Sequence, residues 1–240
     1  MFHRDVRAIA VDWSGARERV RHSLQIAAAP PLRLLGGSTR TEAAELLVRE
    51  AERDPELVVG LDFAFSFPAW YLDELGVGDP RELWELAARE GERWLAEARE
   101  PFWRRARDEA LRGREAFRRT EREVGGAPKS VFQLVGAGQV GTGTLRGLPL
   151  LDRLARAGFS VWPFDDARPP VVVEIYPRLF RDAYAPARPL AGGNPHAFDA
   201  LVSAEVMSRH LEEIRTLRSD PEYALEGRIW RPEPRLHSST

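Results

Sequence analysis

Residues 57–65 (LVVGLDFAF) are apolar nearly throughout, and this segment limits the fold more than any other part of the chain. A half-buried strand alternates apolar and polar residues, whereas a strand buried on both faces is apolar at almost every position. The segment therefore predicts an interior strand of a sheet that is covered on both faces.

The segments before this strand suggest how the sheet is connected. Residues 7–12 form a short apolar run that ends in an acid, and two more extended candidates follow at 19–28 and 31–38. Residues 41–53 have the apolar spacing of a helix. Three strands, a helix and a buried strand are the order of a meander followed by a right-handed crossover, which would place 57–65 parallel to 7–12.

The rest of the chain alternates between helical and sheet-like patterns. Residues 69–123 are helical in pattern and rich in Arg and Glu, and sheet-like runs follow at 131–135, 159–164 and 171–177. Two further helices are expected at about 145–157 and from Asn194-Pro195, an N-cap and first-turn pair, to about 214. We predict one α/β domain over 1–215 with a helical insertion at 69–125, and a C-terminal tail over 216–240 whose polar, proline-containing part, 228–240, is expected to be loose.

Composition excludes several classes of protein. The longest purely apolar stretches are far shorter than the roughly 20 residues of a membrane-spanning helix, and the first residues lack the apolar core of a signal peptide. A cytoplasmic protein without membrane contact is therefore expected. The absence of Cys excludes disulfides, thiolate zinc sites and a cysteine nucleophile. With a net charge of −2, any binding of nucleic acid must come from a local patch.

Three acids lie inside strands that otherwise read as hydrophobic core: Asp12 in AVDW, Asp62 in GLDF and Glu174 in VVEI. A buried, ionised carboxylate without a partner is very costly, so we interpret all three as facing one polar crevice. If 7–12 and 57–65 are adjacent, Asp12 and Asp62 lie about 5 Å apart at the same end of the sheet. Two carboxylates that close repel unless a cation separates them, which favours Mg²⁺ or Mn²⁺.

Each acid also has a simpler interpretation. Asp12 could form a turn with the residues after it, Asp62 could pair with a buried Arg, and Glu174 could form a salt bridge to Arg178 or Arg181. Asp199, about one turn into the last helix, is a candidate fourth member of the site, although an acid is also favoured near a helix N-terminus for electrostatic reasons.

A set of short motifs resembles a known family. VDWSGA, GLDFAFSFP, PKSVFQLVGAGQVGTGTLRG, VVEIYPRLF and HAFDALVSAE, spread over about residues 7–210, are similar to domain-of-unknown-function family 429, whose members are predicted RNase H-like nucleases. The resemblance implies a five-stranded mixed sheet, built from a three-strand antiparallel meander and parallel strands, flanked by helices.

The resemblance also implies a chemistry, metal-assisted hydrolysis of a phosphodiester. By position, Asp12, Asp62 and Asp199 look like the superfamily's metal-binding acids, and Glu174 matches the family's acid-before-proline motif. Two Mg²⁺ or Mn²⁺ ions would clamp the attacking and leaving oxygens. His196, beside Asp199, could move a proton, or it could be an ordinary polar residue at a helix start.

The expected partner is nucleic acid, DNA or RNA. Residues 99–122 contain nine Arg against five acidic residues, with Phe102, Trp103 and Phe117 interleaved. Arg can bind phosphate and aromatic side chains can stack on bases. An amphipathic segment that places its aromatic side chains in the core would have the same sequence.

Three other functions stay open. Gly136, Gly138 and Gly141 spell GxGxxG after the strand-like 131–135 and before a helix, which is the context of a dinucleotide-binding loop. The loop comes late in the chain, however, and does not explain the acids within strands. A kinase of the sugar-kinase and actin type would need a duplicated fold, for which 240 residues are too few. The third alternative is a non-catalytic module that binds nucleic acid.

Overall fold

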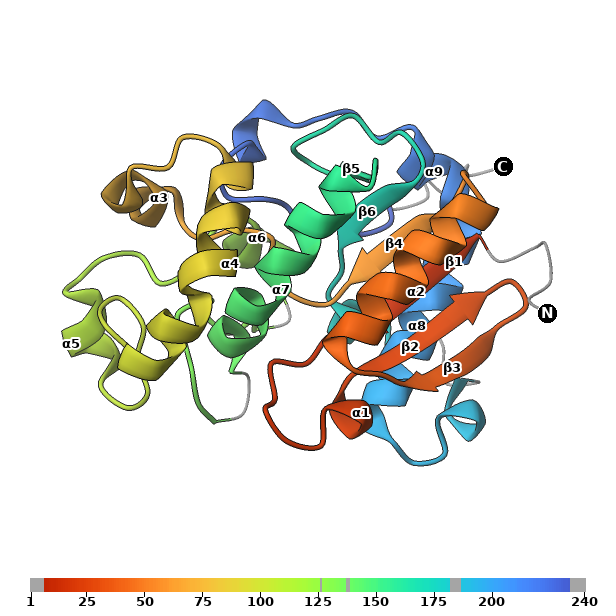
Figure 1. Ribbon diagram of the computed structural model, residues 1–240, viewed down its shortest axis with the longest axis horizontal. Helices are drawn as coiled ribbons and strands as arrows, with labels where there is room; N and C mark the ends of the chain where they lie inside the picture. Colours follow the sequence, from red (N-terminus) through yellow and green to blue (C-terminus); the bar gives the residue numbers. More distant parts are fainter. Residues whose placement is uncertain (1–6, 126, 137–138, 182–186, 234–240) are drawn as a thin grey trace, which may run out of the picture.

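The computed structural model describes residues 7–125, 127–136, 139–181 and 187–233, which form a six-stranded mixed sheet between helices (Figure 1). The strand order is β3-β2-β1-β4-β6-β5. The strands are β1 (Ala8–Asp12), β2 (Gln25–Ala29), β3 (Arg33–Gly37), β4 (Val58–Leu61), β5 (Ser160–Val161) and β6 (Val171–Glu174). The α/β class is confirmed, and the sheet has one strand more than the five expected.

The helices of the described residues surround this sheet. They are α1 (Val20–Ser23), α2 (Arg40–Arg53), α3 (Ala69–Leu75), α4 (Pro80–Glu97), α5 (Arg107–Leu111), α6 (Arg119–Val124), α7 (Val140–Arg156), α8 (Pro195–Arg209) and α9 (Leu211–Arg215), with short 3₁₀ turns at Pro177–Leu179, Pro189–Ala191 and Pro221–Tyr223. None of the described helices has the length and hydropathy needed to cross a bilayer.

The sheet is connected as the sequence predicted. Strands β1, β2 and β3 form an antiparallel meander, and β4 follows helix α2 and pairs in parallel with β1. Val11 lies opposite Leu61 in that pair, so β1 and β4 end at the same level. Strand β6 continues the parallel part of the sheet beside β4. The expected strand at 19–28 begins later, because residues 20–23 form the short helix α1.

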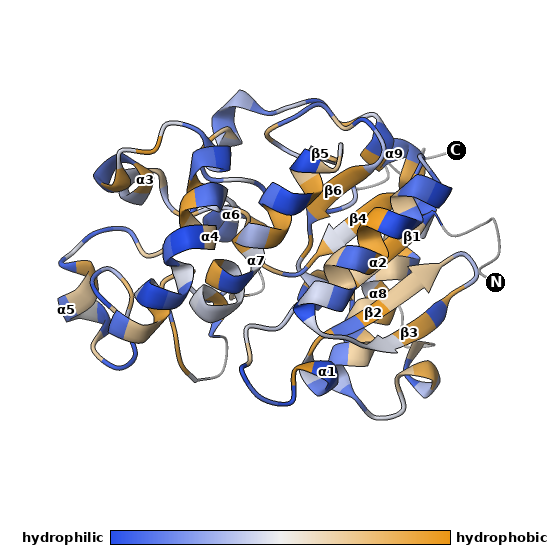
Figure 2. Cartoon of the chain, viewed as in Figure 1, coloured by the Kyte–Doolittle hydropathy of each residue, from blue (hydrophilic) through white to orange (hydrophobic). Residues whose placement is uncertain are grey.

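Both faces of the sheet are covered, as the apolar segment at 57–65 required. On β1 and β4, Ile9, Val11, Val59 and Leu61 belong to the core beneath α2, α4 and α7, whereas Ala8 and Val58 belong to the core beneath α8. The central strands are hydrophobic along most of their length, while the helices that cover them show polar bands (Figure 2). This alternation of side chains decides which helices each strand-end residue can meet.

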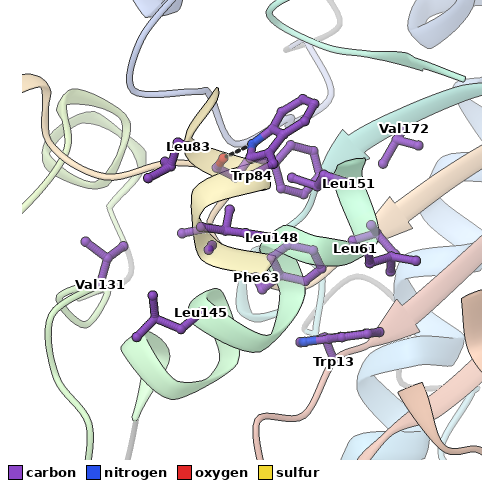
Figure 3. Close-up of a cluster of buried hydrophobic side chains, with 14 of the residues drawn as sticks. Trp13, Leu61, Phe63, Leu83, Trp84, Val131, Leu145, Leu148, Leu151 and Val172 are labelled. Carbon is purple, nitrogen blue, oxygen red and sulfur yellow. Dashed lines mark hydrogen bonds between the residues drawn. The ribbon is translucent and has the colours of Figure 1, made fainter. Parts of the chain in front are cut away.

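The helical segment 69–124 lies beyond the carboxyl ends of β4 and β6 (Figure 1). Its helices share the core of the sheet, because Leu83 and Trp84 of α4 pack in one cluster with Leu61 and Val172 (Figure 3). The Trp84 indole Nε1 donates a hydrogen bond of 2.9 Å to the carbonyl of Phe65, just after β4. The expected helical character of this segment is confirmed, and it packs directly on the sheet.

The C-terminal segment is not loosely held, contrary to expectation. The Trp230 amide donates to the carbonyl of Glu174 at 2.8 Å, and the Trp230 side chain is buried. The carboxylate of Glu226 accepts from the backbone amides of Ala69 and Arg119, at 2.7 and 2.6 Å, and so satisfies the first turns of both α3 and α6. The apolar Ile-Trp pair within a polar tail was the signal for this packing. Residues 234–240 lie outside the described residues.

The predicted strand at 131–135 is also absent. These residues form turns with a single bridge between Gln133 and Trp103. Helix α7 starts at Val140, five positions before the expected start at about 145. The residues directly after the glycine-rich loop are therefore part of this helix.

Two glycines of α7 provide a matched test of this packing. A Cβ at Gly147 would lie 2.5 Å from the Phe63 ring, whereas a Cβ at Gly143 would meet nothing within 4 Å. We expect Gly147→Ala to lower the free energy of unfolding by about 1–3 kcal/mol through overpacking, and Gly143→Ala to leave it unchanged or raise it by up to about 1 kcal/mol. Urea denaturation would measure both changes, and equal effects would contradict the packing of α7 on Phe63.

Candidate functional site

A cleft of about 640 Å³ opens where β4 and β6 end and where α8 begins. Three acids and a histidine from the sequence analysis line it: Asp62, Glu174, Asp199 and His196. Asp12 lies directly behind His196, and only 5% of Asp12 is exposed. The topology therefore brings all five residues to one end of the sheet, although they do not share one environment.

Asp12 and Asp62 form the centre of this group. Asp12 is the last residue of β1, Asp62 follows β4 directly, and the Asp62 amide donates to the carbonyl of Val11 at 3.1 Å. By strand alternation both side chains point to the face covered by α8. The two carboxyls therefore lie side by side, beneath a helix that carries another acid.

The electrostatics of the pair follow from this position. Burial and the negative charge of Asp199 raise the pKa of Asp12 well above its usual range, although a hydrogen bond from Asp62 opposes the shift. Burial, followed by repulsion from Asp12, raises the pKa of Asp62 well above its usual range. Without a cation, the pair favours holding at least one proton.

The turn after β1 is stabilised by Ser14, whose Oγ accepts a hydrogen bond from the Ala16 amide at 3.1 Å.

Helix α8 supplies His196 and Asp199. The Asn194 side chain caps this helix, as predicted, by accepting from the His196 amide at 3.0 Å. The His196 Nδ1 lies 2.7 Å from Oδ2 of Asp12, so the imidazole contacts the strand acid rather than its helix neighbour Asp199. The His196 side chain is 42% exposed, and its ring therefore reaches the cleft.

Asp199 is paired with an arginine. The Arg181 Nε donates to Oδ1 of Asp199 at 2.7 Å, and a second bond joins the guanidinium to the other carboxylate oxygen. This fork-to-fork arrangement is the strongest form of an Arg–carboxylate contact. Because 46% of the Arg181 side chain is exposed, the guanidinium is accessible to a ligand in the cleft.

Glu174 lines the same cleft and its charge helps to raise the pKa of Asp62, but its side chain leaves β6 on the other face of the sheet. On β6 the side chain of Glu174 alternates to the same face as Val172, which is the face covered by α4 and α7. The Arg118 Nη1 donates to Oε2 of Glu174 at 2.9 Å, Nη2 bonds the other oxygen, and the Phe65 amide donates at 3.0 Å. Burial raises the pKa of Glu174, although Arg118 opposes this shift. The expected cluster of four acids is therefore divided by the sheet.

Arg118 is the residue that sequence reasoning missed. It has no exposed surface, and it contacts Glu121, Glu174 and the carbonyl of Glu226. Glu174 thus has an arginine partner, but it is Arg118, the residue just before α6, rather than Arg178 or Arg181. Nothing in the pattern distinguished Arg118 from Arg119 or the other arginines of 99–122, because the choice depends on how the helical segment docks.

These pairings determine which residues could hold a metal ion. Within the described part of the chain, no group of three or more His, Asp or Glu side chains is arranged as a metal site. Asp199 forms an ion pair with Arg181, and Glu174 forms one with Arg118. Asp12 and Asp62 form no ion pair with an arginine in the described residues, and their oxygens are the donors that a hard divalent cation prefers. They could hold such an ion, whereas Asp199 could join them only if Arg181 left it.

Only part of the glycine-rich loop lies within the described residues. Gly136 has a left-handed backbone, with φ of 84°, and lines the cleft, while Gly138 lies outside the described residues. A Cβ at Gly141 would lie 2.5 Å from the carbonyl oxygen of Val131, so this glycine is needed for close packing. Since 131–135 is not a strand, the strand–loop–helix context of a dinucleotide-binding loop is not formed.

The segment 99–122 does not present its aromatic residues to a ligand. Phe102 and Trp103 are buried in the hydrophobic core, and Phe117 is partly buried with the Arg107 guanidinium over its ring. This agrees with the alternative of an amphipathic segment whose aromatic side chains pack inside. Bases cannot stack on Phe102 or Trp103 in this arrangement.

The fold and the cleft together define an α/β protein in which two neighbouring side-chain carboxyls, those of Asp12 and Asp62, lie where two parallel strands end. In open α/β sheets, ligands bind in this position. Comparison of the chain with protein-family models, with curated proteins and with solved structures found no match.

Proposed function

We propose that the protein is a metal-dependent phosphodiesterase of the RNase H-like kind, similar to family 429, that hydrolyses DNA or RNA. The observation that carries the proposal is the pairing of Asp62, which lines the cleft, with Asp12 directly behind it, on the sheet face that α8 completes with Asp199. The antiparallel meander β1-β2-β3 with β4 parallel to β1 supports it as well.

Asp12 and Asp62 would hold Mg²⁺ or Mn²⁺, with Asp199 as a further ligand. When bound, such an ion neutralises charge on the phosphate and lowers the pKa of water that becomes the nucleophile. Glu174 is not part of this ligand set, since Arg118 neutralises it on the opposite face of the sheet.

His196 is placed to handle a proton in the proposed reaction. Its Nδ1 contact with Asp12 fixes the orientation of the ring, which leaves Nε2 as the nitrogen for the substrate. In that role the imidazole would first be protonated at both nitrogens, and Nε2 would then give its proton to the leaving oxygen of the phosphodiester while Nδ1 keeps its contact with Asp12. Orientation of an imidazole through its other nitrogen by a carboxylate is a general way of setting its tautomer.

The rim of the cleft suits a polyanion. Lys129 and Arg178 line the opening, are exposed, and have no acidic partner within the described residues. Cations at the rim contact phosphates outside the reacting position and bind a chain of them without reading its sequence. This arrangement favours nucleic acid over a small phosphoester.

The experiment that tests the function is a cleavage assay with single-stranded and structured DNA and RNA in Mn²⁺. We expect cleavage by the wild type, none after chelation by EDTA, and none by Asp12→Asn. Binding without cleavage at every metal concentration would instead identify a non-catalytic binding module. Equal cleavage by wild type and Asp12→Asn would place the site elsewhere.

Glu174→Gln tests the division of the acids by the sheet. Because Glu174 contacts Arg118 and not the Asp12–Asp62 pair, the variant should keep Mn²⁺-dependent cleavage within about threefold of wild type, a barrier change below about 1 kcal/mol. Initial rates at saturating Mn²⁺ measure this. A loss of cleavage activity as large as that of Asp12→Asn would show that Glu174 belongs to the metal site.

A further inference from the structure

Arg181 lies between the acidic cleft and a second, smaller one. The second cleft has a volume of about 280 Å³ and lies beside the start of α8, where Arg181, Arg188 and Phe198 line it. No acidic side chain lines it among the described residues. The two clefts share Arg181, so this one charged side chain borders both the cleft of the acids and the second cleft.

The second arginine of this cleft, Arg188, packs on an aromatic ring. The guanidinium of Arg188 stacks 4.6 Å from the centre of the Phe198 ring, and within the described part of the chain it has no acidic partner. The Asn194 side chain is occupied, because its oxygen caps α8 and its nitrogen donates to the carbonyl of His22. Arg188 and Arg181 are therefore the groups available to an anion in this cleft.

A phosphate bound in the second cleft would compete with Asp199 for the guanidinium of Arg181. A phosphate offers the guanidinium fork the same paired oxygens that Asp199 offers. Asp199 lies close enough to Asp12 and Asp62 for its negative charge to raise the pKa of both carboxyls. Transfer of Arg181 from Asp199 to a phosphate would leave a third carboxylate facing the pair, where a divalent cation would be bound more tightly.

We propose that the second cleft is a phosphate-binding subsite in which Arg181 and Arg188 bind a substrate phosphate, and that Arg181 thereby releases Asp199 to the metal site of Asp12 and Asp62. This rests on the proposed metal-dependent function and names how the substrate and the metal are coupled. Substrate phosphate and metal then bind cooperatively, and each raises the affinity for the other by the same factor.

The test measures Mn²⁺ affinity by calorimetry with and without sulfate, a tetrahedral anion that Mn²⁺ does not precipitate, at ionic strength matched with chloride. For wild type we expect sulfate to tighten Mn²⁺ binding by about fivefold or more, the lower end of typical coupling between sites. Arg181→Ala should bind Mn²⁺ more tightly than wild type without sulfate, and sulfate should have no further effect.

Two variants separate this exchange from a general change in charge. Arg188→Ala removes the same charge from the same cleft but leaves the Arg181–Asp199 pair intact, so Mn²⁺ affinity without sulfate should stay at the wild-type value while more sulfate is needed for coupling. Arg209→Ala breaks another Arg–carboxylate pair of α8, with Glu205, and should change neither quantity. Arg181→Lys, which keeps the charge, serves if Arg181→Ala fails to fold by circular dichroism, and it should show weakened coupling.

The outcomes distinguish the two proposals. Mn²⁺ binding that depends on Asp12 and Asp62 but ignores sulfate would overturn the exchange and leave the metal-dependent function standing. The exchange is also wrong if Arg181→Ala weakens Mn²⁺ binding, or if Arg188→Ala strengthens it as much as Arg181→Ala does. The absence of Mn²⁺ binding in wild type and all variants would overturn both.

Discussion

Replacing Arg118 with methionine should lower the free energy of unfolding by about 3–5 kcal/mol, the usual cost of removing one partner from a buried ion pair. The guanidinium is completely buried and bonds Glu121 and Glu174, which are themselves buried. Without Arg118 the two carboxylates would remain in the interior with no cation between them. Burial alone would lower the pKa of Arg118, but these two carboxylates raise it above its ordinary value, so the side chain stays charged.

The neighbouring Arg119 provides a matched control for this prediction. Its side chain is 41% exposed and pairs with Glu123 and Glu222 at the surface. Arg119→Met should therefore cost no more than about 1 kcal/mol in the same urea denaturation. The triple variant Arg118→Met, Glu121→Gln, Glu174→Gln should recover most of the loss, because it leaves no unpaired charge. Similar losses for Arg118→Met and Arg119→Met would contradict the buried network.

Asp62→Asn should have opposite effects on activity and on stability. Removal of one of the two central carboxylates should reduce Mn²⁺-dependent cleavage by at least about 100-fold, the scale on which loss of a transition-state contact acts. The metal-free variant should nevertheless be more stable than wild type, because a carboxyl disfavoured by burial and by Asp12 becomes neutral. In a chain of this size each 1 kcal/mol of relieved repulsion raises the Tm by about 2–4 °C.

The pH dependence of stability gives this prediction a sign. The folded-state pKa of Asp62 is raised above the unfolded value, so the folded protein keeps the proton more readily than the unfolded chain. The associated stability is fully present below the ordinary carboxyl pKa and is lost as the pH rises through the raised pKa. Metal-free wild type should therefore lose more stability than Asp62→Asn over that interval.

Thermal unfolding of both proteins across that pH range, in EDTA and in Mn²⁺, measures these effects. Mn²⁺ should stabilise wild type increasingly as the pH rises, because the metal binds the ionised carboxylates, and it should stabilise Asp62→Asn much less. A metal-free Asp62→Asn that is less stable than wild type at every pH would show that Asp62 is a structural acid rather than part of a cation site.

The parts of the fold that follow from local patterns were predictable. The apolar segment 57–65 correctly indicated an interior strand, although β4 ends at Leu61, and the order of segments before it correctly indicated the meander and the parallel β4. Asn194 was identified as the cap of α8 because capping depends only on adjacent residues. The expected strand at 131–135 was wrong because a short apolar run cannot be distinguished from a buried turn by periodicity alone.

Only the part of the site that depends on how the strands align in the sheet could be predicted from the sequence. Because the carboxyl ends of β1 and β4 coincide, Asp12 and Asp62 were expected together, and the structure places them together. The sequence does not show which face of the sheet a strand-end side chain takes, and this is why Glu174 was grouped with acids on the opposite face. The roles of Arg118 and Arg181 depend on contacts between residues more than 15 positions apart, which no local pattern encodes.

The joining of Arg118 to Glu174 and Glu226 has a consequence for how the protein is made. A ribosome releases the chain from its N-terminus, so Arg118 emerges long before the backbone carbonyl of Glu226, which completes its hydrogen bonds. A guanidinium cannot be buried without these partners at acceptable cost. The wall of the cleft that contains Arg118 and Glu174 is therefore expected to close only after Glu226 has left the ribosome, and a shorter nascent chain would not display the finished pocket.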